Sequence, residues 1–333
     1  MNIHSTKGRG RAIAAFSVFL VFLVSGLWAG NAYFAAAGGI LEYRGEGDSK
    51  RIISTPKKAG ECFGFTSTGN IVAGLGEKKI EAGYDIRSGY ELVLLSPAGD
   101  IVMEIARDVL RAYPAPAGNL VAFIDVHHNP MLFTGDEVEN LPFQQKVIQF
   151  AWLPDSSGFI YTGKPFDWSP VKMNNPENTE EFLRLADSNL FLYKLKTGTI
   201  TQLTTHPRED WNPAVSPDGK SVLFQSSRVS HSCFWMVNIE GTRVWQVTVP
   251  RPELKYDENI PIAYTDQLFW NSATGSIIYG TSRPDSTKEI REMRPDGSGA
   301  RILARGRNPQ IMNAGKSVAF QTEEGVVQSL KLK

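Results

Sequence analysis

The stretch HPREDWNPAVSPDGKSVLFQSSR, residues 206–228, is the most regular run of the sequence. It alternates short segments rich in β-branched and aromatic residues with Gly- and Pro-containing turns, a pattern typical of short strands. The predicted strands, including the two that follow the quoted run, span 212–215, 221–225, 233–239 and 243–248. The first two are joined by Ser216-Pro217-Asp218-Gly219. This part of the chain therefore predicts four consecutive strands joined by turns.

The same order of strands and turns recurs along the chain. The predicted units span 61–106, 109–143, 148–204, 212–248, 267–305 and 308–332. In every unit the turn between the first two strands ends in glycine: Gly69, Gly118, Gly158, Gly219, Gly275 and Gly315. The shorter spacings between these glycines, 40 positions, match a propeller blade of about 40–45 residues. We therefore predict an all-β fold, a six-bladed β-propeller of four-stranded blades.

The second strand of the units is a continuous apolar run rather than an alternating one, as in VLFQ and FIYT. A strand that is covered on both faces has this pattern, as do the middle strands of packed blades. The sixth unit ends after its third strand. We predict that KRIIST, residues 50–55, pairs with it and closes the ring, so that the propeller spans 50–333 and residues 38–49 form a linker.

The N-terminus carries an export pattern. Lys7, Arg9 and Arg11 precede an uncharged run at 12–30, and small residues follow at 35–39. Basic residues before an apolar run of about 20 residues predict a signal peptide or an uncleaved signal-anchor helix, here assigned to residues 1–37. If it is uncleaved, residues 12–30 contact the membrane. Both outcomes place the rest of the chain in the periplasm or outside the cell.

Composition excludes several function classes. The chain has 35 basic and 35 acidic residues, so no large basic field favours nucleic-acid binding. Two cysteines provide neither a disulfide framework nor a zinc site. Cys62 and Cys233 fall in distant units of the predicted ring, and a disulfide needs Cα atoms within about 7 Å. We therefore predict two free, buried thiols.

Residues 212–248 resemble the WD40-like repeat of TolB-type propellers. The residues that carry the resemblance are Asn212-Pro213, Ser216 to Lys220, the apolar strand and Ser227-Arg228. RPDGSGARIL at 294–303 is similar to the third-to-fourth-strand turn of that repeat, and LTTHPREDWNP at 203–213 to its junction between blades. The resemblance covers roughly residues 50–333. It implies a six-bladed propeller of the bacterial envelope that acts as a binding platform.

The SPDG turn needs no chemical role. Pro, Asp and Gly suit successive positions of a type I turn, and only the glycine persists in the equivalent turns. Signatures such as G-x-S-x-G, H-E-x-x-H, Walker A and G-x-G-x-x-G are absent from the sequence. These observations favour a protein without enzymatic activity, and neither a metal nor another cofactor is predicted.

Candidate binding residues gather on the face opposite the SPDG turns. In a propeller, loops between second and third strands share this face with the junctions between blades, and two insertions, 164–188 and 249–266, border it. Long loops on a rigid scaffold commonly carry binding residues. The candidates are His127, His128, Phe166, Trp168, His206, Glu209, Asp210, Trp211, Arg228, His231, Tyr256 and Tyr264. The aromatic members suit either partner contacts or the packing of their own loops.

The sequence therefore predicts an exported or membrane-tethered propeller that binds a protein or a glycan of the cell envelope. The alternative is a propeller enzyme, of the lyase or glycosidase type, that acts on a polysaccharide through the histidine-bearing face. The resemblance to TolB-type propellers also extends to the oligogalacturonate lyases, members of that family that use a metal site with histidine ligands on that face. A separate insertion helix over roughly 176–186 is predicted from Asn175-Pro176 and the acidic residues after it.

Overall fold

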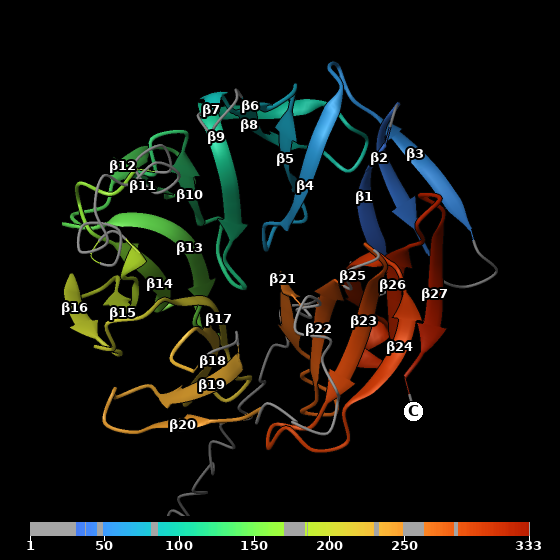
Figure 1. The fold of residues 1–333 in the computed structure, drawn as a ribbon. Helices are drawn as coiled ribbons and strands as arrows, with labels where there is room; N and C mark the ends of the chain where they lie inside the picture. Colours follow the sequence, from blue (N-terminus) through green and yellow to red (C-terminus); the bar gives the residue numbers. More distant parts are fainter. Residues whose placement is uncertain are drawn as a thin grey trace, which may run out of the picture.

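The protein is built from antiparallel sheets arranged as a ring (Figure 1). This computed structural model describes residues 31–332 apart from 37, 45–48, 81–85, 170–183, 185, 230–232, 249–262 and 283–285. The described residues form six sheets of three to seven strands and one two-stranded hairpin. The predicted all-β propeller architecture is confirmed. Most of the predicted N-terminal signal or anchor segment and most of the predicted insertion helix lie outside the described residues.

Three sheets have the predicted four-stranded form, each with its strands in chain order. The first contains β13 (Lys146–Trp152), β14 (Gly158–Lys164), β15 (Asn189–Lys194) and β16 (Thr199–Gln202). The second contains β17 (Asp210–Val215), β18 (Ser221–Ser226), β19 (Cys233–Asn238) and β20 (Val244–Gln246). The third contains β21 (Ala263–Trp270), β22 (Ile277–Ser282), β23 (Lys288–Met293) and β24 (Arg301–Arg305). The innermost strands are β13, β17 and β21 (Figure 1).

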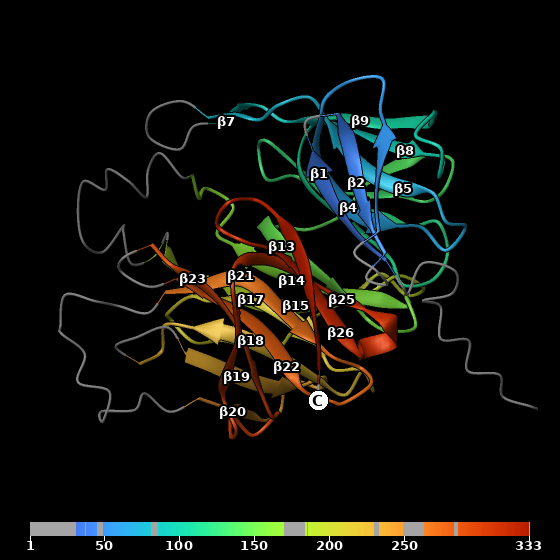
Figure 2. The same cartoon turned by 90° about the vertical axis from the view of Figure 1, so that its right-hand side faces the viewer.

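The first two predicted units are fused into the seven-stranded sheet. Its strands are β4 (Ala59–Phe65), β5 (Ile71–Leu75), β8 (Tyr90–Leu95), β9 (Ile101–Pro114), β10 (Val121–Asp125), β11 (Pro130–Phe133) and β12 (Val138–Asn140). The long strand β9 pairs with β8 through its first half and with β10 through its second half. It is therefore the last strand of one unit and the first strand of the next. Between β5 and β8 the chain forms a hairpin of β6 (Lys79–Ile80) and β7 (Ile86–Ser88). This hairpin projects beyond the sheets (Figure 2).

Two predictions about the N-terminal region are wrong. Residues assigned to the signal segment, the linker and the closing strand form one antiparallel sheet of β1 (Ala32–Ala36), β2 (Gly39–Tyr43) and β3 (Lys50–Ser54). The predicted linker thus contains a strand. The predicted closing strand pairs with β2, not with the last unit, which is a three-stranded sheet of β25 (Arg307–Met312), β26 (Ser317–Gln321) and β27 (Val327–Lys331). The described ring contains this N-terminal unit in addition to the six predicted ones, so the prediction of six four-stranded blades is wrong in the number of units and in the size of the first and last sheets.

The ring closes by packing between these two three-stranded sheets. Ala32, Phe34 and Tyr43 form one core cluster with residues of β25–β27 that include Met312 and Val327. Other clusters lie between each further pair of neighbouring units, so the core is a series of interfaces around the ring. Because each interface buries apolar side chains, the second strands carry apolar runs. The middle strand β14, for example, is buried along its whole length.

A side-chain amide also links the two ends of the ring. Gln310 Oε1 accepts a hydrogen bond from Tyr33 N at 2.8 Å, and Gln310 Nε2 donates to Tyr33 O at 2.5 Å. Gln149 plays a similar part between other inner strands, because its Oε1 accepts from Asn212 N at 2.7 Å. Such amides satisfy backbone groups that inner strands leave unpaired where no strand ladder joins adjacent units.

The SPDG turn has the structural role predicted for it. Gly219 N donates to Ser216 O at 2.8 Å, and Gly219 has φ +71°, a conformation that glycine adopts without strain. Asp218 Oδ1 accepts from Ser216 Oγ at 2.6 Å, which lowers the pKa of this carboxyl. The side chains of the serine and the aspartate thus bond to each other and stabilise the turn.

The described residues include no helix that is both long enough and apolar enough to span a bilayer. The run 12–30, for which that role is predicted, lies outside them. Cleavage within the small residues at 35–39 would separate β1 from β2, because those residues include the end of one strand and the start of the next. A compatible cleavage site therefore precedes Ala32.

Candidate functional site

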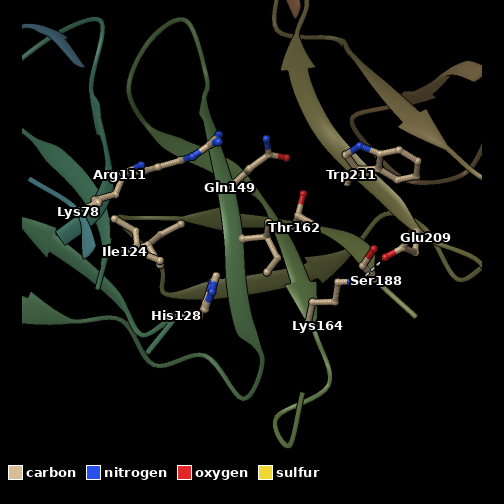
Figure 3. Close-up of a pocket in the computed structure, with 12 residues that line it drawn as sticks. Lys78, Arg111, Ile124, His128, Gln149, Thr162, Lys164, Ser188, Glu209 and Trp211 are labelled. Atoms are coloured by element: carbon tan, nitrogen blue, oxygen red, sulfur yellow. Dashed lines mark hydrogen bonds and ion pairs between the residues drawn. The ribbon is translucent and has the colours of Figure 1, made fainter. Parts of the chain in front are cut away.

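A cavity of about 400 Å³ lies where the inner strands β9, β13 and β17 approach one another (Figure 3). It lies toward the end of the units at which the second strands end, the end for which binding is predicted. Its volume falls in the roughly 300–1,000 Å³ range of small-ligand sites. The lining residues are Lys78, Leu110, Arg111, Ile124, His128, Ile148, Gln149, Thr162, Lys164, Ser188, Glu209 and Trp211. We call this cavity the inner-strand pocket.

The charge of the inner-strand pocket is predominantly positive. Lys78, Arg111 and Lys164 line it, against the single carboxylate of Glu209. Lys164 stands at the end of β14 with a side chain only 8% exposed, and its Nζ donates to Glu209 Oε1 at 2.5 Å. Lys78 Nζ lies 4.0 Å from a carboxylate oxygen of Glu61, outside the pocket lining. An anionic group would therefore be attracted into the pocket.

Uncharged polar groups lie between the charged walls (Figure 3). The hydroxyl of Thr162 is buried and has no hydrogen-bond partner among the described residues. A buried hydroxyl without a partner is costly, so it marks a position where a ligand or a water would complete the site. The side chain of Gln149 is held in place because its Oε1 accepts a hydrogen bond from Asn212 N. Trp211 forms an aromatic wall on the side of β17.

His128 and Trp168 pack together at one end of the pocket. Their ring centroids are 4.8 Å apart in an edge-to-face arrangement, and His128 Nδ1 lies 3.1 Å from Val147 O. Burial lowers the pKa of His128, so the imidazole is held neutral. Phe166, two residues before Trp168, is 73% exposed and lies near the Lys146 ammonium, which is 5.7 Å from the ring centroid. Phe166 is thus exposed for contact with a partner.

Asp210 and Arg228, both predicted as binding residues, form a buried ion pair instead. The Asp210 carboxylate is fully buried and accepts from Arg228 Nε at 3.1 Å, from Arg228 Nη2 at 2.6 Å and from Ser226 Oγ at 2.6 Å. Arg228 also lies over the rings of Phe224 and Trp235. The pair anchors the start of β17 and thereby positions Glu209 and Trp211, on either side of Asp210, toward the pocket.

The remaining predicted residues are not part of the pocket lining. His127 is exposed, and the partly exposed His206 accepts a hydrogen bond from Arg208 N through Nδ1. His231, Tyr256 and the side chain of Tyr264 lie outside the described residues. Across the described part of the chain, no three His, Cys, Asp or Glu side chains are grouped so as to hold a metal ion. A site that includes His231 stays untested.

The pocket also contains residues that sequence reasoning missed, above all Arg111, Thr162 and Lys164. For Lys164 the sequence contains one indication. In FIYTGK a lysine ends an apolar second strand where the corresponding run VLFQSS has a serine. A charged residue at the end of a strand buried along its length is unusual enough to indicate a site. Arg111 carries no such mark, because it lies in a strand of mixed composition.

Both cysteines are free, as predicted, but only Cys233 is buried as predicted, whereas Cys62 is half-buried. Cys233 is buried, and burial raises the pKa of the Cys62 thiol to about 12. Neither thiol is therefore an activated nucleophile.

No family model matches the sequence. Over 125 residues, 35% of this chain, it is 24% identical to the uncharacterized protein Atu1656 of Agrobacterium fabrum (strain C58), and the match spans 36% of that protein. The solved structures that resemble the chain include TolB-like and related six-bladed propellers. A putative TolB from Agrobacterium tumefaciens has a TM-score of 0.52 at 16% identity, covering 86% of this chain and 94% of that one.

Two further structures agree. TolB from Acinetobacter baumannii has a TM-score of 0.52 at 13% identity, covering 90% of this chain and 76% of that one. An oligogalacturonate lyase in complex with manganese has a TM-score of 0.57 at 15% identity, covering 90% of this chain and 82% of that one. Identities this low establish architecture and not activity. The chain therefore has the fold of the TolB-like propellers.

Proposed function

We propose that this protein is an exported or membrane-tethered propeller that binds an acidic glycan of the cell envelope in the inner-strand pocket, without catalysing a reaction. The observation that supports this function is the composition of the pocket: three cationic side chains face one carboxylate in a cavity of about 400 Å³. Charged walls favour an anionic group, and the partly buried position strengthens its electrostatic attraction relative to that in water.

The uncharged part of the lining fits a sugar ring. Aromatic side chains supply a flat apolar surface, and hydroxyl and amide groups such as those of Thr162 and Gln149 supply the few placed polar contacts that fix a ligand's orientation. Exposed Phe166, two residues before the Trp168 that packs on His128, adds surface for neighbouring sugars or for a protein that carries the glycan. Location in the envelope rests on the basic residues and the apolar run at 12–30.

Calorimetric titration with a matched pair of disaccharides tests the proposal. Cellobiouronic acid and cellobiose differ in one carboxylate, so we expect the acid to bind and the neutral sugar to bind at least tenfold more weakly. Changing Arg111→Gln should weaken binding of the acid by about tenfold, since it removes one charge from the wall. Arg294→Gln, which removes an exposed charge from a turn at the opposite end of the units, is the control.

Equal affinity for both disaccharides, or an effect of Arg294→Gln as large as that of Arg111→Gln, would contradict the proposal. Chromatography of the sugar after incubation, with and without manganese, separates binding from the alternative enzymatic function. Intact sugar after many protein equivalents supports a binding protein, whereas cleavage products would establish the enzyme. If the protein captures an envelope protein that carries no glycan, the partner is a protein and the proposed glycan ligand is wrong.

A further inference from the structure

Among the described residues that line the inner-strand pocket, Glu209 supplies the single carboxylate, and it is already paired with the most buried cation, Lys164. Lys164 Nζ and Glu209 Oε1 are 2.5 Å apart, yet the two side chains differ in burial. That of Lys164 is 8% exposed and that of Glu209 is 38% exposed. One member of the pair thus belongs to the interior, and the other reaches in from the surface (Figure 3).

Lys164 is fixed in place. It ends the fully buried strand β14, and its Nζ also donates to Ala186 O at 3.0 Å and lies 5.8 Å from the ring centroid of Trp168. An ammonium in such surroundings requires a negative partner, because an unpaired buried charge is strongly unfavourable. The position opposite Lys164 Nζ is therefore an anion position whether or not Glu209 fills it.

Glu209 is held by its backbone rather than by its side chain. Its carbonyl oxygen accepts from Ser227 N at 3.0 Å, and the next residue, Asp210, is locked by Arg228. Beyond the contact with Lys164, no other hydrogen bond of the Glu209 carboxylate is present among the described residues. Rotation of this side chain toward solvent therefore requires no backbone movement and leaves the start of β17 in place.

We propose that Glu209 is an exchangeable counter-ion, which the carboxylate of an incoming ligand replaces on Lys164. This inference rests on the proposed binding of an acidic glycan and adds how its carboxylate is recognised. The exchange keeps Lys164 paired at every stage, and it moves the Glu209 charge into water, where a carboxylate is well solvated. No bond is made or broken other than hydrogen bonds.

The geometry also selects the class of anion. The space beside Lys164 Nζ already accommodates a carboxylate, that of Glu209, so a ligand carboxylate reproduces the same contacts. A phosphate monoester is bulkier and carries a higher charge than the carboxylate that this position already accommodates. Glu209 thus makes the pocket selective for carboxylates and lowers its affinity for every anion, because each must compete with an internal one.

Glu209→Gln tests the exchange. Glutamine keeps the shape and one acceptor but removes the charge, so it competes with a ligand carboxylate for the ammonium without the Coulombic attraction of an ion pair. We expect the affinity for cellobiouronic acid to rise about fivefold and that for cellobiose to stay unchanged. Glu137→Gln, an exposed site on the β11–β12 turn, changes the net charge equally and should have no effect. Lys164→Met should abolish binding of the acid.

The outcomes separate the two proposals. Binding of the acid by the wild type, with Glu209→Gln unchanged or weaker, overturns the exchange and leaves the proposed function standing. Failure of the wild type and of all variants to bind overturns both. Equal binding of glucose 6-phosphate overturns the carboxylate assignment. A crystal structure of the complex is the second measurement: we expect the ligand carboxylate at Lys164 Nζ and the Glu209 side chain turned to solvent, and an intact Lys164–Glu209 pair beside bound ligand refutes the exchange.

Discussion

Removing the buried carboxylate of Asp210 tests whether this residue anchors the fold rather than contacting a partner. In Asp210→Ala the Arg228 guanidinium loses two charge-assisted hydrogen bonds, at 3.1 and 2.6 Å, while its own side chain is only 11% exposed. Ser226 Oγ loses its acceptor as well. Breaking a buried ion pair by removing one partner typically costs about 3–5 kcal/mol. We expect a loss of this size in the free energy of unfolding.

Urea unfolding followed by tryptophan fluorescence measures the loss. Asp167→Ala is the matched control, because Asp167 forms a similar Arg pair with Arg184 that is about half exposed, and such pairs contribute about 0–1 kcal/mol. The double variant Asp210→Ala with Arg228→Met should regain a large part of the stability, since it removes the orphaned charge. A loss below about 1 kcal/mol for Asp210→Ala, or no recovery in the double variant, would refute the reasoning.

Three further predictions concern the ring and its buried groups. Gln310→Leu leaves both backbone groups of Tyr33 without their amide partner, so hydrogen exchange of the Tyr33 amide should speed up and stability should fall by about 2 kcal/mol. Burial raises the pKa of Cys62 to about 12, so iodoacetamide at pH 8 should modify it only in denaturant; rapid labelling of native protein would contradict this. Burial lowers the pKa of His128 below its unfolded value of about 6.5. The unfolded state then binds more protons, so stability should fall as the pH drops below that value, and His128→Gln should flatten this dependence in urea titrations at several pH values.

Much of the fold follows from local pattern. The turn at Ser216–Gly219 and the apolar strand after it were identified correctly because turn chemistry and strand burial are short-range signals. The free state of Cys62 and Cys233 followed from the repeat alone. The fused strand β9 was not foreseen, since two consecutive strands and one bent strand have the same sequence pattern. Asp108, with φ +56°, lies at the bend between the two halves.

The site was only partly predictable. Of the predicted candidates, His128, Glu209 and Trp211 line the pocket and Trp168 packs against His128, because the repeat determines at which end of the units the loops lie. Asp210 was named with them, yet its carboxylate points into the protein. Residues 209–211 lie at the start of a strand, where successive side chains point to opposite sides, and register in three dimensions decides which side faces a cavity.

The sequence by itself determined the repeat, its turns and its buried middle strands, because each depends on interactions between residues close in the chain. Only the tertiary structure decided how the ring closes and where the pocket lies. Residues 32–54 carry small and apolar residues that suit either a processing segment or strands, and they become strands because they complete the core between β4 and β25–β27. The pocket combines side chains from Lys78 to Trp211. Their convergence depends on how neighbouring units pack, which no local pattern records.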